Sequence, residues 1–375
     1  MSAKLSKHIA VLAGDGIGPE VIAQALKVLR AIEQVFGHKF TYEEALVGAA
    51  AIDATGDPLP PETIAICQKS DAILFGAIGD PKYDNDPNAK VRPEQGLLKL
   101  RKTMGLFANI RPVKAYDTLL HISPLKKENI RGSDFVIYRE LTGGIYFGKK
   151  ERSADGQSAS DDCTYSVPEI ERITHMAFKA AQLRRKKLML IDKANVLETS
   201  RLWRDTVKKM AVQYPDISLD FLFVDNAAMQ IIINPKQFDV IVTENMFGDI
   251  ISDESSVITG SLGLLPSASV GDKYAMFEPI HGSYPQGAGK DIANPCATIL
   301  SAAMMLDHFG LHEEAGVIRS AVDYLLHHHI VTIDLNPKKH YSTSTIGDLA
   351  AEVIIEKSRS FIHEKNVLMG ESTII

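Results

Sequence analysis

The order of apolar runs and helical patterns along the chain predicts an α/β sheet. Short apolar runs typical of buried strands occur at 9–13, 72–76, 134–138, 188–191, 219–224 and 239–243. Apolar residues recur with helical spacing at 20–35, 169–186, 199–213, 247–258, 295–309, 312–328 and 346–363. Strands that alternate with helices in this way are typical of α/β proteins.

Capping signals and loop-rich stretches add detail to this pattern. Ser166 and Pro168 precede an acidic helical turn, and Asn294 and Pro295 precede an apolar helix. Glycine, proline and polar residues predict loops at 54–62, 79–93, 151–162 and 282–294. The last three are longer than usual connections, which makes them candidates for function.

The first predicted strand leads into a glycine-rich turn, "GDGIGPEV", at 14–21. Gly14 and Gly16 have the spacing of a dinucleotide-binding turn, but Pro19 stands where the third glycine is needed. Glu43 and Glu44 lie at the distance expected of a ribose-binding acid. The residues alone therefore leave open whether a nucleotide binds at this turn.

Composition limits the classes of function. The chain has 375 residues, 45% hydrophobic and 23% charged, with a net charge of −6. Its length suits two domains or one large α/β unit, and a negative protein lacks the positive field that attracts nucleic acid or acidic lipid. Three widely spaced cysteines and the lack of a long apolar segment predict a cytoplasmic, soluble protein without disulfides.

Two aspartates are candidates for a metal site. Asp249 and Asp253 are four residues apart on a predicted helix, so their carboxylates share one face. Asp225, at the end of a predicted strand, is a further candidate, and oxygen ligands favour Mg²⁺ or Mn²⁺. The alternative is that both helical acids are solvated near a helix N-terminus, where acids are favoured.

Arginine is concentrated in two segments. "RPEQGLLKLRKTMGLFANIRP" carries Arg92, Arg101 and Arg111, and "VIYRELTGGIYFG" carries Arg139 and Tyr146. Arginine binds carboxylates through a planar fork, although any single surface arginine is usually structural. Acids and arginines together suggest a metal chelated by an anionic substrate.

Eight segments in order resemble the β-decarboxylating dehydrogenases of the isocitrate/isopropylmalate dehydrogenase family over essentially the whole chain. They are "GDGIGPEV" at 14–21, "GLLKLRK" at 96–102, "FANIRP" at 107–112, "RELTGGIYFG" at 139–148, "DKANVLE" at 192–198, "NMFGDIISDE" at 245–254, "GSLGLLPSAS" at 260–269 and "EPIHGS" at 278–283. Within the family, "GLLKLRK" resembles the isopropylmalate branch.

The resemblance implies a two-domain isopropylmalate/isocitrate dehydrogenase-like fold with a central mixed sheet, which is not a Rossmann fold. One domain, 1–106 with 260–375, is expected to carry most of the cofactor site. The other, 107–259, is expected to carry the metal ligands and a homodimer interface. The active sites are then shared between two copies of the chain, and Glu43 and Glu44 are ordinary acids at a strand end.

The resemblance also assigns residues by position. Lys193 from the partner copy corresponds to the acceptor of the hydroxyl proton, and Tyr146 to the proton donor. Asp249 and Asp253, with Asp225 from the partner, correspond to the metal ligands. Substrate-binding positions are Glu94, Leu97, Leu98, Arg101, Arg111, Arg139, Val196 and Asp225. Cofactor-binding positions are Ile17, Glu278, His281, Gly282, Ser283, Gln286, Gly287, Ala288, Gly289 and Asn294.

The implied activity is oxidative decarboxylation of 3-isopropylmalate to 4-methyl-2-oxopentanoate and CO₂ with reduction of NAD, a step of leucine biosynthesis. Mg²⁺ or Mn²⁺ is the implied metal, and a monovalent cation is a further candidate. Leu97 and Leu98 favour an isopropyl group over a third carboxylate, because burying an unpaired carboxylate against them is costly. The alternatives are a related enzyme acting on D-malate, tartrate or homoisocitrate, and a non-catalytic regulatory subunit.

One position departs from the family pattern. Gln286 stands where isopropylmalate enzymes commonly place an aspartate on the adenosine ribose. An amide still accepts a hydrogen bond but does not repel a phosphate, so a weaker preference for NAD over NADP is expected.

Overall fold

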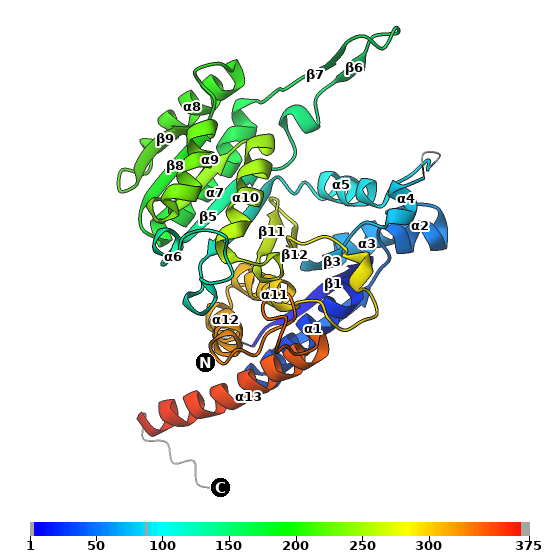
Figure 1. The fold of residues 1–375 in the computed structure, drawn as a ribbon, viewed down its shortest axis with the longest axis vertical. Helices are drawn as coiled ribbons and strands as arrows, with labels where there is room; N and C mark the ends of the chain where they lie inside the picture. Colours follow the sequence, from blue (N-terminus) through cyan, green and yellow to red (C-terminus); the bar gives the residue numbers. More distant parts are fainter. Residues whose placement is uncertain (1–3, 87–88, 369–375) are drawn as a thin grey trace. The chain divides into compact units, whose positions relative to one another are not determined.

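The computed structural model describes residues 4–86 and 89–368, which fold into two compact units (Figure 1). The first unit consists of Met1–Leu100, Leu262–Ser267 and Tyr274–Ile375, and the second of Arg101–Ser261 and Ala268–Lys273. No helix among the described residues is long and apolar enough to span a membrane.

The first unit contains four parallel strands in the order β2-β1-β3-β12. The strands are β1 Ser6–Gly14, β2 Lys39–Glu44, β3 Ala72–Ala77 and β12 Ala275–Pro279. The helices are α1 Gly18–Phe36, α2 Ala49–Thr55, α3 Pro61–Lys69, α4 Pro81–Asp84, α11 Cys296–His308, α12 His312–His327 and α13 Thr343–Leu368, with short 3-10 turns η4 Leu262–Leu264 and η5 Pro285–Gly287. Helix α5, Pro93–Thr103, continues from the first unit into the second.

Helix α1 shows how the sequence forms this unit. Pro19 lies in the first turn, where its missing N–H costs nothing, and Gly37 ends the helix in a left-handed conformation. Val21, Ala25 and Ile32 lie on its buried face with helical spacing. The helix therefore starts directly after the "GDGI" turn and holds that turn against the sheet.

The second unit contains a mixed sheet. Strands β11, β4 and β5 pair antiparallel, and β5, β10, β8 and β9 pair parallel. The strands are β4 Ala108–Lys114, β5 Asp134–Glu140, β8 Lys187–Asp192, β9 Ser218–Phe223, β10 Val240–Thr243 and β11 Pro266–Val270, of which β11 begins in the first unit. The helices are α6 Lys127–Ile130, α7 Val167–Leu183, α8 Glu198–Ala211, α9 Val224–Ile233 and α10 Asn245–Thr259, with 3-10 turns η1 Asp117–Leu119, η2 Gly144–Tyr146 and η3 Pro235–Gln237.

Helices cover both faces of this sheet. Along β10, Val240 and Val242 belong to the apolar core that contains Phe178 of α7, whereas Ile241 belongs to the core that contains Ile251 of α10. Because side chains alternate along a strand, a strand buried on both faces reads as a continuous apolar run. The α/β class and the mixed sheet predicted from the sequence are confirmed.

Three local predictions were wrong. The loop expected at 151–162 contains a hairpin of β6 Lys150–Arg152 and β7 Ala159–Asp161, whose exposed polar strands carry no apolar pattern. Strand β9 ends at Phe223, so Asp225 lies in the first turn of α9 rather than at a strand end. Helix α10 begins at Asn245 rather than after Gly248.

Candidate active site

Asp249 and Asp253 lie one turn apart on helix α10. The side chain of Glu244 caps this helix, and its Oε1 accepts from the Phe247 N–H at 2.6 Å. Because the helix starts at Asn245, both aspartates lie beyond the first turn, where the effect of the helix dipole has largely faded. A preference of acids for the helix N-terminus therefore does not explain this pair.

Asp249 contacts two predicted site residues from other segments. The Arg139 guanidinium pairs with Asp249 Oδ1, and the Tyr146 hydroxyl donates to Asp249 Oδ2 at 2.9 Å. Gly248 allows this approach, because a Cβ there would lie 2.6 Å from Arg139 Cγ. The motifs "RELTGGIYFG" and "NMFGDIISDE" thus meet in one cluster.

Asn245 holds Arg139 in place. Its Oδ1 accepts from Arg139 Nε at 3.1 Å and from Nη2 at 2.9 Å, and its own amide donates to the Gly143 carbonyl at 3.1 Å. The Arg139 side chain is only 6% exposed, so this hydrogen bonding offsets part of the cost of burying its charge. Asn245 is not among the residues predicted for the site, although it opens the "NMFGDIISDE" motif.

Arg111 makes a similar set of contacts with the next acid. Its Nη1 donates to Asp253 Oδ1 at 3.0 Å and to Ser252 Oγ at 2.5 Å, and its Nε donates to the buried side chain of Asn109 at 2.8 Å. Asp253 remains 69% exposed. Two of the three predicted metal ligands, Asp249 and Asp253, therefore each pair with a predicted substrate arginine.

The charges of three arginines act on one another in this cluster. Burial lowers the pKa of Arg139 to about 10; the positive charges of Arg111 and Arg101 contribute, whereas Asp249 opposes the change. Burial and the hydrogen bond to Asp249 raise the pKa of Tyr146, so its hydroxyl keeps its proton at neutral pH. Three arginines that repel one another favour the binding of carboxylates.

Lys193 and Asp225 form a separate pair. Lys193 Nζ lies 2.7 Å from Asp225 Oδ1, and its hydrogen bond lowers the pKa of that carboxyl. Among the residues that the structure describes, no three His, Cys, Asp or Glu side chains converge as a metal site. One copy of the chain therefore does not bring Asp225 to Asp249 and Asp253.

The two acids of the "GDGIGPE" segment in the first unit accept hydrogen bonds from the backbone of other segments. The Asp15 carboxylate accepts from the backbone N–H groups of Ala49, Ala50 and Gly79 at 2.9–3.0 Å. Glu20 accepts from the N–H groups of Gly289 and, at 3.2 Å, Asp291. In a phosphate-binding turn the backbone N–H groups bind the ligand. Here two carboxylates of the segment accept from the backbone N–H groups of other segments.

The same turn packs against Ser283, at the start of the loop that holds most predicted cofactor positions. The Ile17 N–H donates to the Ser283 carbonyl at 2.8 Å. A Cβ on Gly16 would lie 2.1 Å from that carbonyl oxygen, so only glycine fits here. Asp15 and Glu20 are not among the predicted site residues, although both belong to the "GDGIGPEV" motif.

Other predicted cofactor positions differ in their surroundings. The His281 Nε2 is buried and has no partner among the described residues, and burial lowers the pKa of this imidazole, which keeps it neutral. Gln286 is exposed, and Glu278, Ser283 and Gly287 are buried. Asn294 accepts from the Cys296 N–H and donates to Asp334, both at 3.1 Å, so its amide is engaged at the start of α11.

The predicted specificity residues present apolar side chains to solvent. Leu98 on α5 is 49% exposed, Leu97 is partly buried, and Val196, which follows Lys193, is 61% exposed. Glu94 lies in the first turn of the same helix. Exposed apolar side chains such as Leu98 and Val196 are available to contact a ligand or a second chain.

Comparisons with known proteins agree on one family. Residues 8–350 match the family described as isocitrate/isopropylmalate dehydrogenase. The chain is 57% identical over 346 residues to the 3-isopropylmalate dehydrogenase of Heyndrickxia coagulans, covering 91% of this chain and 94% of that protein. It is 55% identical over 341 residues to the enzyme of the same name from Bacteroides fragilis, covering 90% and 96%.

Solved structures give the same result at lower identity. The isocitrate dehydrogenase of Methylococcus capsulatus superposes with a TM-score of 0.83 at 32% identity, covering 93% of this chain and 99% of that one. A beta-decarboxylating dehydrogenase from Thermococcus kodakarensis superposes with a TM-score of 0.79 at 33% identity, covering 93% and 96%.

Proposed function

The chain belongs to the isocitrate/isopropylmalate dehydrogenase family, and from that premise we propose that it converts 3-isopropylmalate to 4-methyl-2-oxopentanoate and CO₂ with reduction of NAD. The main support is its 55–57% identity, over at least 90% of the chain, to proteins named for that activity. The product places the reaction in leucine biosynthesis.

The arginine and aspartate cluster supports this chemistry. Arg101, Arg111 and Arg139 bind the two carboxylates of the malate part. Asp249 and Asp253 have the partly exposed oxygen atoms that Mg²⁺ or Mn²⁺ needs, and Asp225 of a second copy completes the set. When bound, the cation supplies positive charge that lowers the pKa of the substrate hydroxyl and stabilises negative charge developing next to it.

The remaining groups carry protons. Lys193 of the second copy accepts the proton of the substrate hydroxyl, while the hydrogen on the carbon that bears this hydroxyl leaves as hydride to the nicotinamide. The new 2-oxo group then accepts the electron pair of the bond broken when CO₂ is lost. Tyr146, which keeps its proton at neutral pH, protonates the resulting carbon.

A homodimer is part of the proposal. In one chain Lys193 and Asp225 pair with each other, and Asp225 does not join the other two aspartates. Apolar side chains are exposed on the helices that carry these acids: Met229 at 51% and Ile233 at 52% on α9, and Ile250 at 56% on α10. A second copy that covers this surface buries the apolar atoms and brings its own Lys193 and Asp225 to the cluster.

A substrate panel tests the activity. With NAD and Mn²⁺, we expect 3-isopropylmalate to exceed an unbranched malate by about 10- to 200-fold in kcat/KM, because Leu97, Leu98 and Val196 contact its isopropyl group. Isocitrate should be poorer still, since its third carboxylate has no partner there. NADH formation in a spectrophotometer gives these ratios, and faster turnover of isocitrate or D-malate would assign the chain to another branch.

Gln286 predicts a modest cofactor preference. NAD should be used better than NADP, because nothing at Ile333 or Pro337 supplies the cation or phenol that a 2′-phosphate needs, although Lys338, Lys339 and His340 follow closely. Gln286→Asp should lower kcat/KM for NADP about tenfold by adding like-charge repulsion and change NAD less. Steady-state kinetics with both cofactors measure this, and equal use of NADP by the wild type would refute it.

Glu20 should act on cofactor binding through the loop it holds. Glu20→Gln keeps one acceptor oxygen but loses the charge-assisted hydrogen bonds to Gly289 and Asp291, so KM for NAD should rise about fivefold with kcat unchanged. Glu62→Gln, on the exposed first turn of α3, is the matched control. An equal effect of both variants, or a change in kcat alone, would argue against this role.

A further inference from the structure

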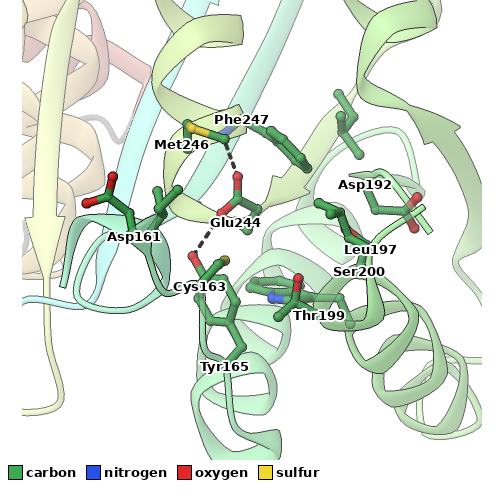
Figure 2. Close-up of a pocket in the computed structure, with 13 residues that line it drawn as sticks. Asp161, Cys163, Tyr165, Asp192, Leu197, Thr199, Ser200, Glu244, Met246 and Phe247 are labelled. Atoms are coloured by element: carbon green, nitrogen blue, oxygen red, sulfur yellow. Dashed lines mark hydrogen bonds between the residues drawn. The ribbon is translucent and has the colours of Figure 1, made fainter. Parts of the chain in front are cut away.

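Tyr165 lies at the junction of the two segments that form the arginine and aspartate cluster. It stands just before α7 and is only 6% exposed, and its ring packs edge-on against Trp203 with centroids 5.5 Å apart. Figure 2 shows its hydroxyl pointing to Glu244, at the N-terminus of α10. Buried hydroxyl groups almost always have hydrogen-bond partners, so the partners of this one indicate what the side chain does.

The Tyr165 hydroxyl fixes the start of α10. It donates to Glu244 Oε2 at 3.1 Å and accepts from the Asn245 N–H at 3.0 Å. The first backbone N–H groups of a helix have no partner within the helix, so other groups must supply one. Burial and the negative charge of Glu244 raise the pKa of Tyr165, so the hydroxyl keeps the proton that it donates. One hydroxyl therefore holds both the cap residue and the first residue of this helix.

The same side chain lies against the turn that leads to Tyr146. A Cβ on Gly144 would lie 2.2 Å from the Tyr165 hydroxyl oxygen, and a Cβ on Gly143 would lie 2.9 Å from the Tyr165 ring. The Gly144 N–H also donates to the Thr164 carbonyl at 3.2 Å. The glycine pair therefore allows a close approach that a larger residue would prevent, and this turn rests on residues 164 and 165.

Asn245 joins the helix and the turn. Its backbone N–H donates to Tyr165, its side-chain amide donates to the Gly143 carbonyl at 3.1 Å, and its Oδ1 accepts from Arg139 at 2.9 and 3.1 Å. The Arg139 side chain is almost fully buried, so its charge depends on such partners. A shift of the Asn245 backbone therefore moves the acceptor that holds the Arg139 guanidinium.

We propose that Tyr165 is a positioning residue for the substrate site: its hydroxyl sets the place of Asn245, and Asn245 sets the place of the Arg139 guanidinium. Arg139 binds a substrate carboxylate in the proposed function, so this role rests on that function. Tyr165 acts only through its neighbours. A tyrosine that only stabilised the fold would, by contrast, leave substrate binding unchanged when its hydroxyl is removed.

Tyr165→Phe and Tyr214→Phe are a matched pair, because each removes one hydroxyl from the same apolar core. Tyr214 is 9% exposed, and its hydroxyl lies 2.8 Å from His175 Nδ1. Both variants should lower Tm, since each leaves a hydrogen-bond partner unpaired. Only Tyr165→Phe should raise KM for 3-isopropylmalate, by about tenfold, with KM for NAD within about twofold of wild type. An equal change of the substrate KM in both variants would overturn the proposal.

A double-mutant cycle tests the route through Asn245. In the Asn245→Ala background, Tyr165→Phe should change KM for 3-isopropylmalate by less than about twofold, because the side chain through which it acts is already gone. A full tenfold effect in that background would overturn the proposal. If Tyr165→Phe does not fold, Glu244→Gln replaces it, since the new NH₂ group faces the Tyr165 hydroxyl and competes with the Asn245 N–H for it. The substrate KM should then rise, and an unchanged KM would contradict the role.

Binding of a dicarboxylate separates this proposal from the proposed function. Malate, titrated in the presence of Mn²⁺ and followed by thermal shift, requires Arg139 but no turnover. Its apparent Kd should rise about tenfold in Tyr165→Phe and stay unchanged in Tyr214→Phe. A wild type that binds malate without oxidising 3-isopropylmalate would contradict the proposed function, and the same comparison of variants would still decide the role of Tyr165. A wild type that binds no malate would overturn both.

Discussion

Arg111→Ala and Lys193→Ala chains, each inactive alone, should together recover about a quarter of the wild-type rate after subunit exchange. If each active site takes Arg111 from one copy and Lys193 from the other, a mixed dimer has one intact site and one site with both defects. Random exchange makes half of the dimers mixed, and half of their sites work. The recovered rate therefore follows from the symmetry of the dimer.

The measurement needs proof that subunits exchange. The two variants are mixed under mild denaturant and returned to buffer, and mixed dimers are identified by mass spectrometry before NADH formation is assayed. Lys193→Ala mixed with Asp225→Ala is the control, because both changes then affect residues donated by the same copy. Equal recovery in both mixtures, or none despite mixed dimers, would contradict shared sites.

The contacts of Lys193 and Asp225 make this the sharpest test of the dimer. Their ion pair of 2.7 Å, with Asp225 68% exposed, has the form of an ordinary surface pair, and such pairs stabilise a protein little. If the pair were only structural, Lys193→Ala would change stability slightly and leave turnover intact. The mixing experiment separates these two explanations, because only a site shared between copies gives recovery.

The strand and helix pattern could be predicted from the sequence where burial is one-sided or continuous. Runs such as "VIVT" in β10 are apolar on both faces, and α1 has a clear buried stripe. Strands β4, β11 and β12 are not in the predicted set. They contain small residues or proline, as in "PSASV" of β11, and hydrogen bonding to neighbouring strands, not local preference, makes them extended.

The candidate site could be predicted in its charged residues but not in what holds them. Clustered arginines and two aspartates at helical spacing are conspicuous in a sequence. Asn245, Asn109 and Glu20 are residue types that are common on protein surfaces, so nothing distinguishes them. Their roles depend on long-range contacts, such as Asn245 with Arg139 across 106 positions of sequence. Only the fold brings such pairs together, so a periodic pattern carries no signal for them.

Asp249→Asn should abolish most activity and also lower stability slightly, which the sequence alone would not predict. If only the repulsion within the helix is considered, removing one of two like charges four residues apart should stabilise the folded protein by a few tenths of a kcal/mol. In the structure Asp249 pairs with Arg139, which is almost fully buried, and losing that charge should cost about 1 kcal/mol after allowing for the partial exposure of Asp249. The cost of losing the pair with Arg139 is larger than the gain from relieved repulsion, so the net result is a slightly less stable protein.

The effect on activity should be far greater than the effect on folding. If Asp249 holds the metal as proposed, removing its charge should lower kcat by at least about 100-fold, whereas a loss of about 1 kcal/mol leaves a typical protein almost entirely folded. Asp205→Asn, at an exposed position of α8, is the matched control and should change neither quantity.

A readout independent of turnover completes the test, because the metal should bind the folded state preferentially. Mn²⁺ should raise the Tm of the wild type, EDTA should reverse the rise, and Asp249→Asn should respond to neither, since binding to the native state stabilises by mass action. Full turnover of the wild type in excess EDTA, or an equal Mn²⁺ shift in Asp249→Asn, would show that Asp249 does not hold a catalytic cation. Its contacts with Arg139 and Tyr146 would then be its whole role.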